Sequence, residues 1–127
     1  MNNKDKKPKI LVIDDEPDFS NALKIRLESN GYEVVVAGDG ISGLGLARSL
    51  LPDLIILDLM LPKMDGFLVA RFLKFDNRFD SIPIIILSAR SQASDIKMGM
   101  EVGADLYLTK PFKSEELLGG ISKLLKI

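Results

Sequence analysis

Short, unbroken apolar runs recur along the chain, and each is followed by a longer segment in which apolar residues return at helical spacing. Runs of this kind are typical of parallel strands that are buried on both faces. The pattern predicts five strands, which lie near residues 9–13, 33–37, 54–57, 83–87 and 105–108.

Five helices are expected between and after these strands. The first is predicted from the spacing of Phe19, Leu23 and Leu27, and the others from about 41–50, 66–75, 91–102 and 114–125. Gly99 disfavours the fourth helix, whereas Gly103 suits the position just past its end. Strands that alternate with helices predict a doubly wound α/β fold, a parallel sheet with helices on both faces. For five strands, 2-1-3-4-5 is the natural order.

Size and composition bound what the chain can be. With 127 residues, 46% of them hydrophobic, it is long enough for one core and too short for two ordinary domains. The longest apolar run is far too short for a membrane span, and the lysine-rich start lacks the apolar segment of a secretory signal. We therefore expect a cytoplasmic domain over residues 9–127, preceded by a flexible tail over residues 1–8.

Residue types that are missing restrict the chemistry. The chain has no cysteine and no histidine, which removes disulfides, thiolate metal sites and the commonest general base. Its net charge of -1, without a dense basic stripe, gives little electrostatic attraction for nucleic acid. Any reaction must therefore use carboxylates, hydroxyls, lysine and bound metal.

Polar side chains follow four of the predicted strands at the points where those strands end. The carboxyl ends of parallel strands in an open α/β sheet converge on one crevice, where ligands bind. We therefore expect three carboxylates, a hydroxyl and an ammonium to share one site, formed by Asp14, Asp15, Asp58, Ser88 and Lys110.

Repulsion within such a site calls for a cation. Two ionised carboxylates about 5 Å apart repel by roughly 3 kcal/mol at an effective dielectric of about 20, and Lys110 supplies one positive charge at most. Oxygen ligands without histidine or cysteine favour a hard divalent ion, Mg²⁺ before others. Asp14 and Asp15 also suit the N-cap of the first helix, so one of the two can serve as a cap.

A metal beside a carboxylate and a lysine suits phosphoryl transfer, in which the protein mainly positions groups and neutralises charge. Asp58 is then the nucleophile, because carboxylates form aspartyl phosphates without a general base at neutral pH. Lys110 would pair with one phosphoryl oxygen and Ser88 would hydrogen-bond another. Singly, such a serine is more often a cap and such a lysine is usually just exposed, so the inference rests on their convergence.

Several motifs occur in a fixed order between about residues 9 and 126: Ile13-Asp14-Asp15-Glu16-Pro17, Asp58-Leu59-Met60-Leu61-Pro62-Lys63-Met64-Asp65-Gly66, Leu87-Ser88-Ala89, Gly103-Ala104-Asp105 and Thr109-Lys110-Pro111-Phe112. Together they resemble the receiver domain of bacterial two-component response regulators. The resemblance implies a flavodoxin-like fold with strand order 2-1-3-4-5. It also implies that a histidine kinase or phosphotransfer protein donates a phosphoryl group to Asp58.

The same resemblance assigns the metal ligands. Asp15, Asp58 and the backbone carbonyl of Met60 are expected to bind Mg²⁺ directly, and Asp14 to act mostly through water. The Lys110-Pro111 peptide bond is expected to be cis, a form that proline alone makes common.

Two further pairs of residues take roles from the resemblance. Ser88 and Tyr107 form the expected switch pair, which changes the surface of the fourth helix, fifth strand and fifth helix; without the family, Tyr107 would simply pack on an edge strand. Met60 and Arg90 are expected to flank the phosphoryl group and to make its hydrolysis slow. Alternatively, both side chains point into solvent.

The surface of the fourth helix, fifth strand and fifth helix bears on how the domain contacts other proteins. In the receivers of many DNA-binding response regulators, charged residues pair across a dimer interface, and the resemblance places Ile96, Leu106 and Gly120 at those positions. We therefore expect a monomer that presents an apolar patch of Ile96, Met98 and Leu106 to an unknown downstream protein. We expect no direct binding to nucleic acid or membranes. The alternatives are a haloacid-dehalogenase-like phosphohydrolase, for which the chain is short, and a degenerate receiver that serves as a scaffold.

Overall fold

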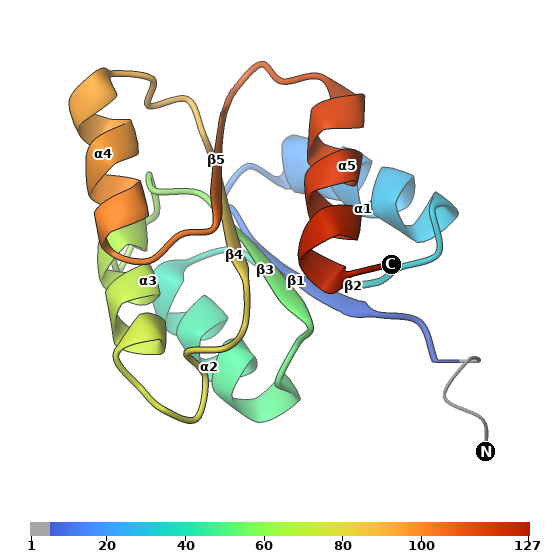
Figure 1. Cartoon of the computed structure of the whole chain (residues 1–127), viewed down its shortest axis with the longest axis horizontal. Helices are drawn as coiled ribbons and strands as arrows, with labels where there is room; N and C mark the ends of the chain where they lie inside the picture. Colours follow the sequence, from blue (N-terminus) through green and yellow to red (C-terminus); the bar gives the residue numbers. More distant parts are fainter. Residues whose placement is uncertain (1–5) are drawn as a thin grey trace.

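The computed structural model describes residues 6–127 (Figure 1). The tail predicted over residues 1–8 therefore lies mostly outside the described residues. Strands and helices alternate in the order β1 (Lys9–Ile13), α1 (Pro17–Ser29), β2 (Glu33–Ala37), α2 (Gly40–Leu50), β3 (Leu54–Leu57), α3 (Gly66–Lys74), β4 (Ile84–Ser88), α4 (Ala93–Glu101), β5 (Leu106–Thr109) and α5 (Ser114–Leu125). Within the described part of the chain, none of the helices combines the length and the apolar character needed to cross a membrane.

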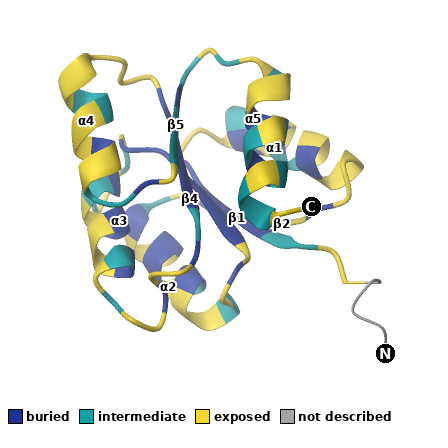
Figure 2. Ribbon diagram, viewed as in Figure 1, coloured by how far each residue is buried: buried dark blue, intermediate teal, exposed yellow. Residues whose placement is uncertain are grey.

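The five strands form one parallel sheet in the order β2-β1-β3-β4-β5, which confirms the predicted fold. The central strands β1, β3 and β4 are almost wholly buried, which explains their unbroken apolar sequences (Figure 2). Helices α1 and α5 pack on one face of the sheet, and α2, α3 and α4 cover the other (Figure 1). The sheet therefore lies between two apolar layers.

The ends of several elements differ from prediction by one or two residues. Ser88 and Thr109 are paired in register and belong to β4 and β5, because the parallel ladder continues one residue beyond the apolar runs. Helix α4 is shorter than the predicted 91–102. It ends at Glu101, and Gly103 follows with a φ of +111°, which confirms its expected position just past the helix.

Gly99, which disfavours a helix on propensity alone, has a packing reason to lie inside α4. A Cβ atom at this position would come within 2.8 Å of the Ile86 side chain and 2.9 Å of the Tyr107 ring. Glycine therefore lets α4 lie directly on β4 and β5, and the space it leaves is taken by the tyrosine ring.

Candidate functional site

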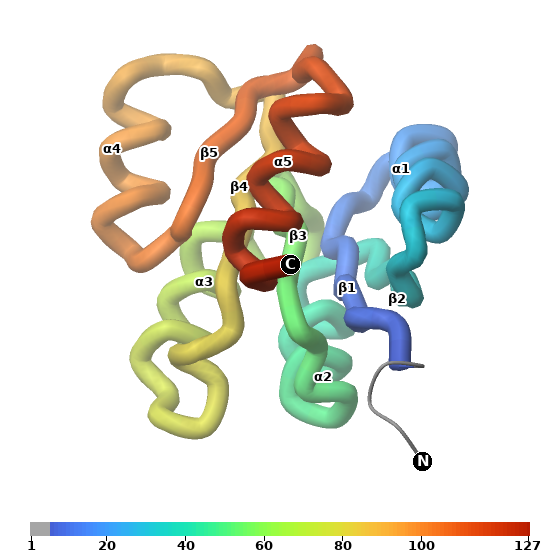
Figure 3. The backbone as a smooth tube through the Cα atoms, turned by 45° about the vertical axis from the view of Figure 1, so that its right-hand side comes forward, coloured from blue at the N-terminus to red at the C-terminus, as the bar shows by residue number. Residues whose placement is uncertain are grey.

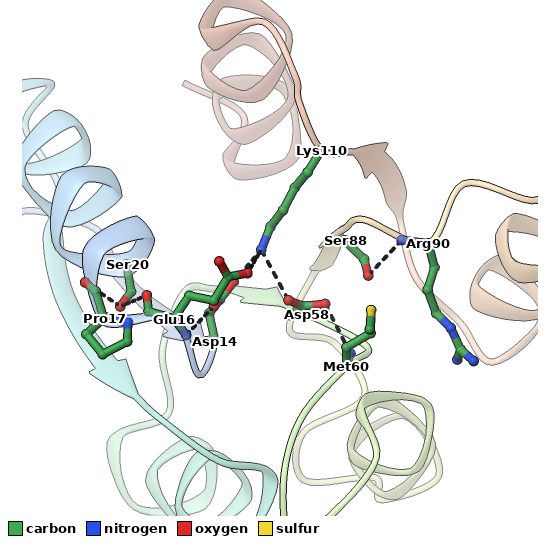
Figure 4. Close-up of polar contacts among 9 residues, drawn as sticks. All are labelled: Asp14, Glu16, Pro17, Ser20, Asp58, Met60, Ser88, Arg90 and Lys110. Carbon is green, nitrogen blue, oxygen red and sulfur yellow. Dashed lines mark hydrogen bonds and ion pairs between the residues drawn. The ribbon is translucent and has the colours of Figure 1, made fainter.

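The carboxyl ends of β1, β3, β4 and β5 bring the predicted residues to one edge of the sheet (Figure 4). Asp14 follows β1 and Asp58 follows β3, and both are held in line by backbone bonds that prolong the ladder: Asp14 N donates to Ala37 O at 3.0 Å and Asp58 N to Ile13 O at 2.9 Å. Ser88 ends β4, and Lys110 comes directly after β5. These four side chains therefore lie together because the carboxyl ends of parallel strands meet at one edge of the sheet.

Lys110 lies at the centre of the charged cluster. Its Nζ donates to Asp14 Oδ2 at 2.8 Å, to Asp58 Oδ2 at 3.1 Å and to Glu16 Oε1 at 3.4 Å. The Asp14 and Asp58 side chains are only 3% and 4% exposed, so water screens these contacts poorly. One ammonium thus holds together carboxylates from two buried strand ends.

The pKa values of Asp14 and Lys110 reflect both burial and this pairing. Burial raises the pKa of Asp14 above its ordinary value, although hydrogen bonds from Lys110 and from the Glu16 backbone oppose the rise. Burial alone would lower the pKa of Lys110, but the contacts with Asp14 and Asp58 together outweigh burial and raise it. The ammonium therefore remains charged at neutral pH.

Three carboxylates could hold a cation in common. Oxygen atoms of Asp14, Glu16 and Asp58 all lie within 4.8 Å of one another. Asp15, which the sequence groups with Asp14 and Asp58, is exposed and lines an adjoining open cavity of about 320 Å³ with Met60 and Arg90. Sequence reasoning missed Glu16 as a member of the cluster, although it directly follows the Asp14-Asp15 pair.

Asp14 also acts at the start of α1. Its Oδ1 accepts a hydrogen bond from the Glu16 backbone N–H at 2.9 Å, while its Oδ2 contacts Lys110. Glu16 itself is the N-cap residue and makes no capping bond through its side chain. Asp14 therefore both accepts a hydrogen bond from the backbone at the start of α1 and belongs to the charged cluster.

Asp58 has a polar contact at each carboxylate oxygen. Oδ1 accepts from the backbone N–H of Met60 at 3.1 Å, and Oδ2 accepts from Lys110. The Met60 side chain itself is 56% exposed. The backbone of residue 60 thus belongs to the site, whereas its thioether lies at the surface.

Ser88 and Tyr107 are joined through the backbone of Arg90. The Ser88 hydroxyl is fully buried and accepts from Arg90 N at 3.3 Å, and the Tyr107 hydroxyl donates to Arg90 O at 2.7 Å. The Arg90 guanidinium lies 3.8 Å from Asp95 and 5.8 Å from the Phe67 ring centroid, away from Asp58 (Figure 4). In this structure, Arg90 therefore contacts the site through its backbone.

An aromatic pair flanks Lys110. The Phe19 ring centroid lies 4.0 Å from Lys110 Nζ, and the Phe19 and Phe112 rings meet edge to face with centroids 6.2 Å apart. Sequence reasoning placed Phe19 only on the apolar stripe of a helix, so its cation–π contact was missed. The Lys110-Pro111 peptide bond, which leads from the site to Phe112, is cis.

The expected apolar patch on α4 and β5 is only partly exposed. Met98 is 49% exposed, but Ile96 and Leu106 are half-buried. Leu106 packs on α5, where a Cβ atom added to Gly120 would come within 2.5 Å of the leucine side chain. Gly120 therefore makes room for Leu106, and the surface at this point is less apolar than the sequence indicates.

Comparisons with known sequences point to one family. A family model described as the response regulator receiver domain matches residues 10–122. The DNA-binding dual master transcriptional regulator RpaA of Synechocystis sp. is 51% identical over 119 residues, which are 94% of this chain and 49% of the relative. The DNA-binding response regulator MtrA of Mycolicibacterium smegmatis is 42% identical over 118 residues, 93% and 50% respectively. The chain thus spans about half the length of the curated relatives it matches.

Solved structures agree with this result. The receiver domain of Francisella response regulator 1452 is 36% identical, with a TM-score of 0.88 and coverage of 94% of this chain and 98% of the other. The receiver domain of the sensor histidine kinase PA1611 from Pseudomonas aeruginosa is 30% identical, with a TM-score of 0.88 and coverage of 96% and 100%. The latter structure is described with a magnesium ion coordinated in its active site cleft.

Proposed function

The chain belongs to the response regulator receiver family, and from this membership we propose that it is a signalling switch in which Asp58 accepts a phosphoryl group. The cluster of Asp14, Glu16 and Asp58 is typical of the phosphoacceptor site of such domains. The observation that carries the proposal is the pairing of Lys110 Nζ with both Asp14 and Asp58 at the carboxyl edge of the sheet. It places a positive charge beside a buried carboxylate, as phosphoryl transfer requires.

The donor in this proposal is a phosphohistidine of a sensor kinase or phosphotransfer protein in the cytoplasm. A carboxylate oxygen of Asp58 forms the new P–O bond while the P–N bond of phosphohistidine breaks. The bond's electron pair returns to the imidazole ring, which then takes a proton from solvent. Lys110 neutralises charge on the phosphoryl oxygens, a role supported by its raised pKa.

Mg²⁺ is the proposed cofactor, and the donor set fits it. The clustered acidic side chains offer carboxylate oxygens, and carboxylate and carbonyl oxygens are the ligands that hard divalent ions prefer. Asp15, Asp58 and the carbonyl of Met60 would hold the ion, with Asp14 acting through water and Glu16 adding negative charge nearby. When bound, the ion would neutralise charge on the transferred group.

Switching is proposed to run from Ser88 to Tyr107. The buried Ser88 hydroxyl accepts from Arg90 N and still has its own proton to donate to a phosphoryl oxygen. Because Tyr107 donates to the carbonyl of Arg90, movement of this backbone would change the tyrosine contact as well. New contacts made only in the phosphorylated state would thereby bias the position of α4.

The proposed output is contact between the α4–β5–α5 surface and a downstream protein, with the domain itself remaining a monomer that binds neither nucleic acid nor membrane. The half-buried Ile96 and Leu106 and the exposed Met98 supply apolar area there, while the charges that would pair across a two-fold interface are replaced. Slow loss of the phosphoryl group is part of the proposal, because Met60 has no group that could orient an attacking water.

Intact-mass measurement tests the proposal. Incubation with acetyl phosphate and Mg²⁺ should add one phosphoryl group to the wild type and none to Asp58→Asn. Asp18→Asn, which removes an exposed carboxylate from α1, is the matched control and should label normally. Undiminished labelling of Asp58→Asn would remove Asp58 as the acceptor, and no labelling of the wild type would favour a scaffold without phosphoryl transfer.

A further inference from the structure

A second surface lies on α3, away from the charged cluster. Leu68, Phe72 and Phe75 follow one another at helical spacing and are 42%, 44% and 78% exposed. Together with Arg48 of α2 they line a groove of about 630 Å³. Helices α2 and α3 lie side by side in both views (Figures 1 and 3). A contiguous exposed strip of this kind, with two aromatic rings, is uncommon on a surface that only faces water.

The groove lies toward the amino edge of the sheet. Helix α3 begins at Gly66, just after the β3–α3 loop, and runs back along the sheet, so that Phe75 lies at its far end. Asp58 lies at the opposite, carboxyl edge. A partner in this groove would therefore leave the phosphoacceptor site accessible.

The uncompensated charge of the groove is positive. Arg48 and Arg71 are exposed, and within residues 6–127 neither guanidinium lies within 4.0 Å of a carboxylate. The acidic member of the groove, Asp76, is already paired, since Arg78 Nε and Nη2 donate to its two oxygens at 3.1 and 2.8 Å. This pairing, with a smaller contribution from the charge of Arg48, lowers the pKa of Asp76 to about 2. The groove is thus cationic although the whole chain carries a net charge of -1.

The aromatic strip and the charges are also arranged together. The Arg71 guanidinium lies 5.7 Å from the centroid of the Phe75 ring, within the range of a cation–π contact. Lys74, on the same helix, is turned inward instead, where Nζ donates to the carbonyls of Asp80 and Ile82. The two arginines therefore border the apolar strip. Its side chains lie at positions i, i+4 and i+7, which is the spacing of apolar contacts made by a helix bound in a groove.

We propose that this groove docks an acidic amphipathic helix of a protein partner, with apolar side chains on the Leu68–Phe72–Phe75 strip and carboxylates beside Arg48 and Arg71. Exposed aromatic and arginine side chains are the types that dominate binding energy at protein interfaces. The charge pattern selects an acidic partner over a neutral or basic one. The groove shares no residue with the site around Asp58, so docking does not require phosphorylation.

Fluorescence anisotropy with designed probes tests this inference without Mg²⁺ or a phosphoryl donor, so its failure and the failure of phosphoryl transfer remain distinguishable. The probe is a labelled helical peptide with Leu, Trp and Leu at positions i, i+4 and i+7 and glutamates on both flanks. The comparison peptide has glutamine in place of every glutamate. We expect the acidic peptide to bind at least about tenfold more tightly and to lose affinity as salt is raised.

Matched variants locate the binding surface. Phe72→Ser and Arg71→Gln should each weaken the acidic peptide about tenfold or more. Arg26→Gln makes the same charge change, and Ile25→Ser removes a comparable apolar side chain, at exposed positions of α1; both should have no effect. Phe75→Ser, at a position 78% exposed, repeats the test where a folding defect is least expected.

Four outcomes would overturn the proposal. One is equal binding of the glutamine peptide, and another is binding that none of the groove variants weakens. The third is a dimer in sedimentation that Phe72→Ser dissolves, which would make a second copy of the chain the occupant. The fourth is sedimentation with phosphatidylglycerol vesicles that depends on Phe72 and Arg71 while the acidic peptide fails to bind, which would make the groove a lipid-binding surface.

Discussion

Replacement of Lys110 by methionine tests whether one ammonium holds the buried carboxylates together. Methionine keeps most of the length of the side chain and removes its charge. At an effective dielectric of about 20, the contacts of 2.8 and 3.1 Å to Asp14 and Asp58 correspond to attractions of roughly 6 and 5 kcal/mol. The two carboxylates, whose oxygens lie within 4.8 Å of each other, repel by at least about 3 kcal/mol.

The net effect is smaller than these terms, because the ammonium also loses hydration when it is buried. Removing one partner of a buried ion pair typically costs about 3–5 kcal/mol, since the remaining charge is left uncompensated. We therefore expect Lys110→Met to lower the free energy of unfolding by about 3–5 kcal/mol at pH 7 without Mg²⁺. Urea denaturation, with the exposed Lys123→Met on α5 as control, measures the difference.

The pH dependence of the free energy of unfolding is a second test of the role of Lys110. Because the pKa of Lys110 is raised in the folded state, its contribution is complete below the ordinary pKa of lysine and is lost as the pH rises through the folded value. In Lys110→Met, Asp14 loses the hydrogen bond that held its pKa down, so its pKa should rise further. The penalty should then shrink as the pH falls and this carboxyl becomes protonated.

Mg²⁺ should reverse much of the loss. A cation bound to the folded state at about 100 times its Kd adds about 2.7 kcal/mol. The penalty shrinks because the variant, whose carboxylates lack the competing ammonium, should bind the cation more tightly than the wild type does. The reasoning would be refuted if Lys110→Met unfolded within about 1 kcal/mol of the wild type at pH 7 without metal. A penalty unaffected by both pH and Mg²⁺ would equally show that the lysine acts through packing.

Further predictions concern the switch and the lysine. Ser88→Ala and Tyr107→Phe should still accept phosphate but fail to change hydrogen exchange in α4 (residues 93–101); wild-type-like changes in both variants would show that the switch runs through other residues. Phe19→Leu should lower the pKa of Lys110, measured by NMR of the lysine ε-carbon, because the ring favours the charged form, whereas Phe19→Tyr should preserve it. The phosphorylated chain should remain monomeric in light scattering, and a stable dimer would contradict this expectation.

The order of strands and helices could be read from sequence because burial on both faces leaves a plain signal. Buried parallel strands are unbroken apolar runs, and the first three predicted strands match the structure at both ends. Strands β4 and β5 begin and end one residue later than predicted; at their carboxyl ends, Ser88 and Thr109 continue the ladder although their side chains are polar. Hydrophobic patterning identifies the buried residues, but it does not show how far the backbone pairing of a strand continues past them.

The candidate site was predictable to the extent that strand ends converge. That principle brings together Asp14, Asp58, Ser88 and Lys110, but it cannot decide which of several adjacent acidic side chains turns inward. In the structure Glu16 joins the cluster, while Asp15 lines the neighbouring cavity. The direction of each side chain depends on the turn into α1, where Asp14 accepts from the backbone of Glu16.

Contacts through backbone atoms and ring faces left no sequence signal at all. The bond from Tyr107 to the carbonyl of Arg90 and the position of Phe19 over Lys110 both depend on tertiary placement. The same is true of Gly99, whose sequence pattern argues against a helix and whose role is to admit the Tyr107 ring. These features require coordinates, because their chemistry is not encoded in the spacing of residue types.

Chemical mapping of the phosphorylated residue tests the central claim most directly. Borohydride reduces an aspartyl phosphate to homoserine, and peptide sequencing by mass spectrometry then locates the changed position. After treatment with acetyl phosphate and Mg²⁺, we expect homoserine at position 58 and aspartate at position 14. Homoserine at another carboxylate, or its absence from a chain that has gained phosphate, would contradict the assignment of Asp58 as the phosphoacceptor.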